Sequence, residues 1–140
     1  MIDRSIAIVD ASVIYASLDP TDMSFARCTE ALRTTPHQLV IPALVLGEVL
    51  HLVGQRLTPA IESQFLASLA TKDIPVPSAV DWPRIAELVQ AYRSLRLGGV
   101  DASIIALAER LNTDLIFTLD RRHFSVVRPR HMPAFRLPPE

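Results

Sequence analysis

Short apolar runs that alternate with longer amphipathic segments are the feature that most constrains how this chain can fold. The first run, residues 6–9, ends at Asp10, and further runs at 39–41 and 115–119 each follow a segment with helical spacing. Buried parallel strands have this continuous apolar character, and the helices that connect them cover both faces of the sheet. The pattern therefore predicts an α/β fold with a mainly parallel central sheet flanked by helices.

The remaining elements are predicted from apolar spacing and from the residues that begin and end helices. Proline and Ser, Thr or Asp mark helix starts, whereas Gly98-Gly99 and Pro20 mark ends or breaks. We expect short strands at 74–76 and within either 124–127 or 134–137. We expect helices over residues 11–18, 21–33, 42–53, 58–69, 81–97 and 101–111.

Composition limits the class of protein. The chain has 140 residues, of which 49% are hydrophobic and 21% charged, so we expect one folded domain over residues 1–140. Every apolar run is interrupted before it is long enough to span a bilayer, so we expect no membrane segment. The single cysteine, Cys28, excludes an internal disulfide and a cysteine-based zinc site. A reducing cytoplasm is the expected location.

Positive charge is concentrated after Asp120, although the whole chain has a net charge of −1. A basic segment on an otherwise acidic protein indicates a polyanion such as RNA as partner. The alternative is a solvated tail interrupted by prolines. The arginines of this segment are Arg121, Arg122, Arg128, Arg130 and Arg136.

Four acidic residues fall where an α/β sheet binds its ligands. Asp10 ends the first predicted strand and Asp120 ends a later one, and ligands bind at the carboxyl ends of parallel strands. Asp101 opens a helix after a Gly-Gly turn, and Glu48 lies about two turns into a helix that follows a strand, among apolar neighbours. All four can reach the same edge of the sheet, so we predict that they form one site.

Carboxylates that lie close together repel one another, and their pKa values rise unless a cation neutralises them. Oxygen ligands select Mg²⁺ or Mn²⁺, and such an ion supports hydrolysis of a phosphodiester. We therefore predict that Asp10, Glu48, Asp101 and Asp120 bind the metal and carry the catalysis. Taken alone, each aspartate has a simpler explanation as a helix cap or turn residue.

Two hydroxyl side chains lie close to these acids in the sequence. Ser12 follows Asp10 by two residues, and Thr118 precedes Asp120 by two. We predict that they support the site by hydrogen bonding to a carboxylate or a metal-bound water. Ordinary local capping is the alternative for both.

Five stretches carry a resemblance to a known family. They are Ile8-Val9-Asp10-Ala11-Ser12, Ile41-Pro42-Ala43 leading into Leu46-Gly47-Glu48-Val49, Val100-Asp101-Ala102-Ser103-Ile104, Ala108-Glu109-Arg110-Leu111 and Thr118-Leu119-Asp120-Arg121-Arg122-His123-Phe124. In this order and spacing, the chain resembles the PIN-domain family and, within it, the VapC-type ribonuclease toxins of bacterial toxin–antitoxin pairs. The resemblance covers nearly the whole chain. The chain departs from the family in a few extra residues before the first strand and in the Pro- and Arg-rich tail after Val127.

The resemblance implies a PIN fold and cleavage of RNA that depends on Mg²⁺ or Mn²⁺. Carried over by position, Asp10, Glu48, Asp101 and Asp120 would form the acidic site. It further implies a homodimer and inhibition by a cognate VapB-type antitoxin.

The resemblance also bears on four further residues. Ser12 and Thr118 would support the acidic site. Arg121 and Arg122, directly after the last acid, suit contacts with RNA phosphates or with the antitoxin.

Three other functions remain open at this point. The first is an RNA-processing nuclease without an antitoxin, and the second is a catalytically silent RNA- or partner-binding module. Loss of catalysis normally appears as a missing acid, yet all four are present. The third is a phosphatase with Asp10 as nucleophile. That chemistry usually requires a second acid two residues later, where this chain has Ser12, and a placed lysine, whereas Lys72 is the only lysine.

Overall fold

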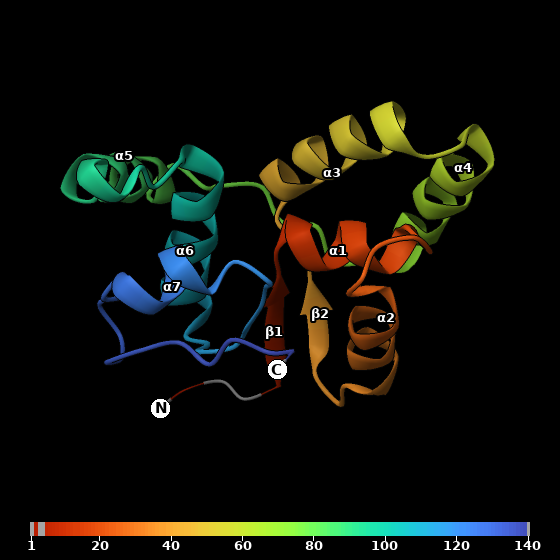
Figure 1. The fold of residues 1–140 in the computed structure, drawn as a ribbon. Helices are drawn as coiled ribbons and strands as arrows, with labels where there is room; N and C mark the ends of the chain where they lie inside the picture. The colour runs from red at the N-terminus through yellow and green to blue at the C-terminus, as the bar shows by residue number, and fades with distance from the viewer. Residues whose placement is uncertain (1, 3–4, 140) are drawn as a thin grey trace.

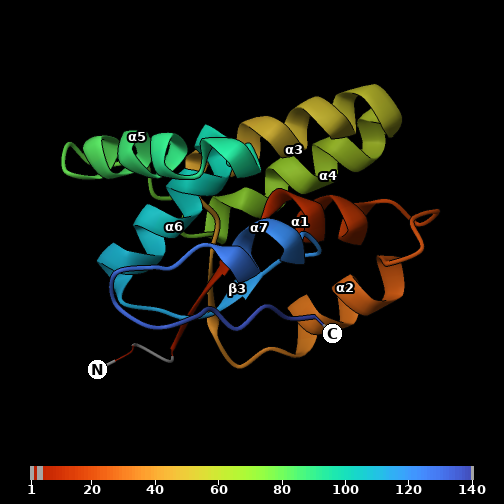
Figure 2. The same cartoon turned by 60° about the vertical axis from the view of Figure 1, so that its left-hand side comes forward.

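A small parallel sheet forms the centre of the molecule. The computed structural model describes residues 2 and 5–139, and its strands are β1 (Ile6–Val9), β2 (Gln38–Val40) and β3 (Ile116–Phe117), in the order β2-β1-β3. Both neighbours of β1 run parallel to it. Figure 1 shows β1 beside β2, and Figure 2 shows β3 next to the last helix. The predicted parallel sheet is confirmed.

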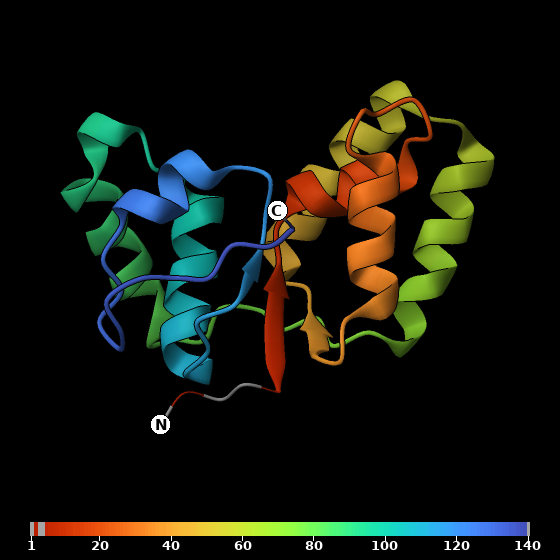
Figure 3. The same cartoon turned by 60° about the horizontal axis from the view of Figure 1, so that its bottom comes forward.

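Helices lie on both sides of the central strand. In Figures 1 and 3, α1–α4 lie on one side of β1 and α5–α7 on the other. No helix in the described part of the chain is both long and apolar enough to cross a membrane. The helices are α1 (Ala11–Leu18), α2 (Phe25–Thr34), α3 (Ala43–Arg56), α4 (Pro59–Ser68), α5 (Asp81–Ala91), α6 (Gly99–Leu111) and α7 (Arg121–Val126), with short 3₁₀ turns η1 (Leu69–Thr71) and η2 (Arg93–Leu95).

The core is built from β1, α3 and α6. Helix α6 buries every residue from Ala102 to Ala108, as expected of a helix packed on all sides. Helix α3 buries Val45, Val49 and Val53, which recur every four residues and form one face. Because α3 and α6 are packed in the core, the residues in the first turn of α6 and on the exposed face of α3 are held in fixed positions.

One predicted strand and one predicted helix end are wrong. Residues 74–76 form no strand; only a single bridge joins Val40 to Asp73, because Pro75 has no N–H to extend the pairing. The helix predicted over 81–97 ends at Ala91, and the chain then passes through η2 to Arg96, whose φ of 59° stops the helical turn.

The second helix also begins later than predicted, at Phe25 rather than near residue 21. The side chains of Asp19 and Asp22 accept the backbone N–H groups of Thr21 and Ser24, so this segment forms turns instead.

The C-terminal tail extends the sheet. The predicted strand at 124–127 is wrong, because Arg121–Val126 is α7. The alternative at 134–137 is nearer the structure: the Arg136 N–H donates to the Asp114 carbonyl (2.7 Å), and Thr118 N–H to the Pro138 carbonyl (2.8 Å). Only one bridge, between Leu115 and Arg136, results because prolines lack the donor that a ladder needs.

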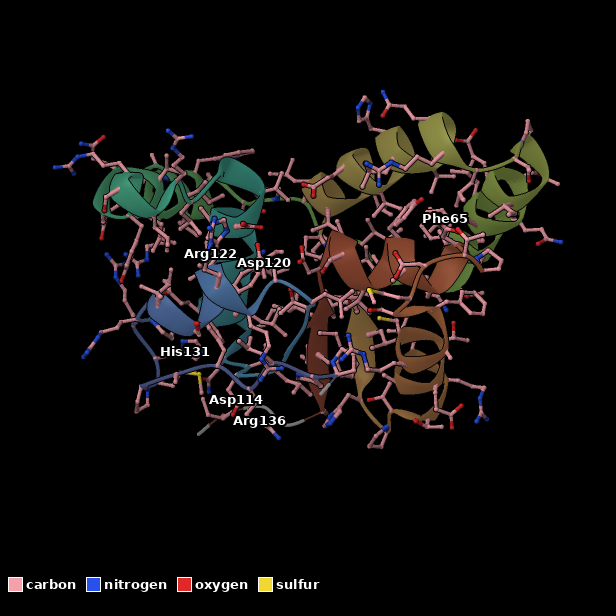
Figure 4. All side chains as sticks on the ribbon, viewed as in Figure 1. Phe65, Asp114, Asp120, Arg122, His131 and Arg136 are labelled. Atoms are coloured by element: carbon pink, nitrogen blue, oxygen red, sulfur yellow. The ribbon has the colours of Figure 1, made fainter. Side chains whose placement is uncertain are left out.

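Ion pairs hold the tail to the body of the protein. Arg136 pairs with Asp114 at 2.8 Å, and the two lie side by side in Figure 4. Arg130 pairs with Glu87 on α5 at 3.0 Å. The tail is therefore packed against the body of the protein, although its arginine side chains remain exposed to solvent as the alternative interpretation expected.

Candidate active site

The carboxyl edge of the sheet brings the four predicted acids together. Asp10 directly follows β1 and donates its N–H to the Phe117 carbonyl of β3 (2.9 Å), so the two strand ends meet. Asp120 begins α7, as Figure 4 shows, whereas Asp101 lies in the first turn of α6. One cavity of about 390 Å³ is lined by all four acids and by Ser12, Tyr15, Asp22, Leu52, Arg56, Val100 and Leu119.

Asp10 is the most buried of these acids, with 5% of its surface exposed. One carboxylate oxygen accepts the Ala11 N–H (2.8 Å), and this caps α1. The other accepts the hydroxyls of Ser12 (3.0 Å) and Thr118 (2.8 Å). Its position and orientation are therefore determined by three segments that meet at the sheet edge: β1, the first turn of α1 and the end of β3.

Ser12 and Thr118 tie Asp10 to the loop that carries Asp120. While each hydroxyl donates to Asp10, its oxygen accepts a backbone N–H: Leu119 for Ser12 (3.0 Å) and Asp120 for Thr118 (2.9 Å). The bonds from Thr118 to Asp10 and from Leu119 to Ser12 join residues more than 100 positions apart, so neither hydroxyl is a merely local cap. This geometry matches the supporting position predicted for both residues.

Glu48 lies on the cavity side of α3 and not among the apolar residues that flank it in the sequence. It is exposed, whereas Val45 and Val49 pack in the core. No hydrogen bond or ion pair to the Glu48 carboxylate is present among the described residues. Leu52 and Arg56 follow it on the same face of the helix, at i+4 and i+8.

The acids perturb one another as the sequence predicted. Burial raises the pKa of Asp10 above its ordinary value, against the hydrogen bonds of Thr118 and Ser12, and the charge of Asp120 raises it further. Burial, followed by the charges of Asp10 and Asp101, raises the pKa of Glu48. Burial also raises the pKa of Asp101, although the hydrogen bond to His123 opposes it. The site therefore concentrates more negative charge than its surroundings neutralise.

His123 joins the site, and the sequence analysis missed it. Its Nδ1 lies 2.9 Å from Asp101 Oδ2 and 3.2 Å from Asp120 Oδ2. Its Nε2 lies 3.3 Å from a guanidinium nitrogen of Arg122, which can only donate. Nε2 is therefore the acceptor, and Nδ1 carries the proton directed at the carboxylates. His123 follows Asp120 by three residues. This spacing brings the two side chains together only in a helix, so it is informative only when the segment is known to be helical rather than a strand.

The donor atoms suit a hard divalent cation. Asp101 and Asp120 each offer a carboxylate oxygen within 4.8 Å of the other, beside His123, and Asp10 and Glu48 line the same cavity. Carboxylate oxygens are the ligands that Mg²⁺ and Mn²⁺ prefer. Burial, and to a smaller extent the neighbouring acids, raises the pKa values of Asp10 and Asp101, and a bound cation would oppose both effects.

The arginines predicted to bind RNA differ in their surroundings. Arg121 donates to the Leu137 carbonyl (2.6 Å), and Arg122 is exposed beside His123. A cation that sequence reasoning missed, Arg56 of α3, lines the acidic cavity with its guanidinium 5.6 Å from the ring centre of Tyr15. Its helical spacing from Glu48 was the available signal.

Comparison with known proteins places this arrangement in a family. Residues 7–128 match the PIN domain. The chain is 33% identical over 124 residues to Ribonuclease VapC26 of Mycobacterium tuberculosis, covering 87% of this chain and 92% of that protein.

Solved structures with lower identity share the fold. Mycobacterium tuberculosis VapC20, described as a sarcin–ricin loop cleaving toxin, superposes with a TM-score of 0.74 at 19% identity, over 92% of this chain and 99% of that one. A toxin–antitoxin complex from Klebsiella pneumoniae gives 0.69 at 21% identity, over 86% and 92%. VapBC2 of Rickettsia felis, bound to a DNA fragment from its promoter, gives 0.66 at 18% identity, over 95% and 97%. The chain belongs to the PIN-domain family and, within it, to the VapC proteins.

Proposed function

We propose that this protein is a metal-dependent endoribonuclease that hydrolyses RNA phosphodiester bonds, and that it is the toxin of a VapBC-type toxin–antitoxin pair. The observation that carries the proposal is the convergence of Asp10, Glu48, Asp101 and Asp120 on one cavity from four separate segments. Its relative VapC26 bears the name ribonuclease, which supports the same chemistry here.

Asp10, Glu48, Asp101 and Asp120 would hold Mg²⁺ or Mn²⁺. When bound, the ion would activate water for attack on the phosphodiester and offset the charge that develops on the phosphate oxygens. The all-carboxylate donor set favours these ions over softer metals.

The chain's own residues prepare this site. Hydroxyls of Ser12 and Thr118 favour the ionised form of Asp10 and fix its direction. The Nδ1 proton of His123 holds the Asp101 carboxylate, and Glu48, without such a partner, is free to turn toward a ligand. In this proposal RNA enters as a single strand or loop, whose backbone and bases are accessible. Arg121 and Arg122 would contact its phosphates.

Related proteins have been solved as toxin–antitoxin complexes, which supports a VapB-type antitoxin as partner of this chain, and we propose a homodimer as its assembly. An RNA-processing nuclease without an antitoxin would use the same site. The presence of all four acids in one cavity argues against a silent binding module. A phosphatase is disfavoured because Lys72 lines a separate groove beside α2 and β2.

The test is cleavage of a mixture of structured RNAs with Mg²⁺ or Mn²⁺ and then with EDTA. We expect metal-dependent cleavage that falls by at least ~100-fold in Asp101→Asn, because a ligand and its charge are lost. Asp73→Asn, which replaces an exposed acid outside the cavity, is the matched control and should cleave normally. Cleavage that survives both EDTA and Asp101→Asn would exclude the proposed site, and RNA binding without cleavage would favour the silent module.

A further inference from the structure

A second pocket, which is basic, borders the acidic cavity. It has a volume of about 360 Å³ and is lined by Arg27 of α2, Arg121 of α7, Thr118, Leu119 and Pro139. Leu119 lines both pockets, and Thr118 donates its hydroxyl to Asp10. The two arginines therefore lie beside the carboxylates, although they are distant in the sequence.

Neither guanidinium is neutralised by an acid. Arg27 donates to the Ser24 hydroxyl (3.1 Å), and Arg121 donates to the Leu137 carbonyl (2.6 Å). Within the described residues neither forms an ion pair, whereas Arg33 on the same helix α2 pairs with Glu30 at 2.7 Å. Each arginine is thus held by an uncharged acceptor and keeps further N–H donors for a ligand.

Two uncompensated like charges around one concavity repel each other, and an anion between them removes that repulsion. The planar fork of a guanidinium matches the spacing of phosphate oxygens. Among residues 2 and 5–139 no acid lines this pocket, so its chemistry differs from that of the neighbouring acidic cavity. Such a pair of sites suits a phosphodiester chain. One phosphate would lie at the acidic cavity, where a bound metal ion would hold it, and another would lie against the two arginines.

We propose that the Arg27–Arg121 pocket binds the RNA phosphate next to the one that is cleaved. This inference rests on the proposed nuclease function. A strand with its scissile phosphate at the carboxylates passes over Thr118 and Leu119 and brings its next phosphate to the two guanidiniums. An acidic segment of an antitoxin is the other anion that fits. RNA is favoured because Leu119 lines both this pocket and the cavity that holds the acids that would cut it.

The experiment measures RNA affinity separately from cleavage. A fluorescein-labelled single-stranded RNA of mixed sequence is titrated by anisotropy, in Mg²⁺ and at several salt concentrations, against protein carrying Asp101→Asn. In that background we expect Arg27→Gln and Arg121→Gln each to weaken binding about tenfold and to reduce the salt-dependence slope by about 0.7, the value for one phosphate contact on a single strand. The double variant should lose less than the product of the single losses, since both contact one phosphate.

Arg33→Gln is the matched control, because it removes the same charge from the same helix outside the pocket. Equal losses in Arg33→Gln, or unchanged affinity and slope in both pocket variants, would overturn the proposal. Loss of antitoxin binding with RNA binding intact would also overturn it, in favour of an acidic protein segment. Arg27→Lys keeps the positive charge but lacks the planar guanidinium. Compared with Arg27→Gln it should recover part of the RNA affinity, which would show that the fold tolerates a substitution at residue 27. Absence of cleavage by the wild type would count against the nuclease function and not against the phosphate pocket. The binding comparisons could still be interpreted in that case.

Discussion

His123 donates its Nδ1 proton to the carboxylate of Asp101 across 2.9 Å, and this contact joins α7 to the first turn of α6. The same nitrogen lies 3.2 Å from Asp120. One imidazole therefore holds two acids whose negative charges would otherwise face each other without a donor between them. We infer that His123 positions these carboxylates in the metal-free protein.

Replacing His123 with alanine should destabilise the metal-free protein by about 1–2 kcal/mol, because two partly buried carboxylates lose their donor. Saturating Mg²⁺ should recover most of this loss, since the cation then offsets the same charges. Thermal unfolding in EDTA and in Mg²⁺ measures both effects. His51→Ala, an exposed histidine on α3, is the control. Equal stability of His123→Ala and wild type in EDTA would contradict the positioning role.

Glu48→Gln should stabilise the metal-free protein at neutral pH by less than about 1 kcal/mol, the size expected of a charge that solvent screens. Burial and the charges of Asp10 and Asp101 raise the pKa of Glu48 in the folded state. The contribution of an acid with a raised folded pKa is present at low pH and is lost as pH rises through that pKa. The gain of the variant should therefore shrink as pH falls and wild-type Glu48 becomes protonated.

The order of the two proteins should reverse when Mg²⁺ is added, because the wild type binds the ion more tightly and gains more stability from it. Unfolding curves at pH 4 and 7, with and without Mg²⁺, test both parts. Glu62→Gln on α4, outside the cavity, is the control. A variant less stable than wild type in EDTA at pH 7 would contradict the repulsion argument.

The convergence of the acids could be predicted from the sequence because it depends on where the parallel strands end. Parallel strands place their carboxyl ends at one edge, so the acids that directly follow two of the predicted strands were expected there. Asp10 follows β1, and Asp120 follows β3, even though β3 covers only Ile116–Phe117. The parallel sheet and its flanking helices follow from the same alternation of elements and are confirmed.

Features that depend on partners distant in the sequence could not be predicted. Residues 124–127 have strand-like composition, but Phe124 is buried and the Asp120 side chain caps a helix, so tertiary packing decides the segment. That error concealed His123. The tail arginines were interpreted as available for RNA because their acidic partners are distant in the sequence. Asp114 neutralises Arg136, and Glu87 neutralises Arg130.

Breaking the ion pair between Arg84 and Glu109 should cost much more stability than breaking a surface pair. Arg84 contacts both carboxylate oxygens at 2.8 Å, and the side chains are only 14% and 10% exposed. We expect Arg84→Ala to cost about 3 kcal/mol, since it leaves the buried Glu109 carboxylate without its charged partner and with only the Arg130 N–H as donor. Arg33→Ala, whose pair with Glu30 is 68% and 61% exposed, should cost less than about 1 kcal/mol. Urea unfolding of both variants measures the difference, and equal losses would contradict it.

Thr118→Val should weaken Mn²⁺ binding by about 10–100-fold, the effect expected when a hydrogen bond to a ligand is removed. The hydroxyl of Thr118 opposes the rise in the pKa of Asp10, so its loss leaves Asp10 protonated to a higher pH, and protons then compete with the metal. The deficit should therefore be larger at the lower of two pH values than at the higher one. Mn²⁺ titrations followed by electron paramagnetic resonance measure it, with Thr34→Val on the surface of α2 as the control. An affinity equal to that of the control at both pH values would mean that Thr118 does not support Asp10.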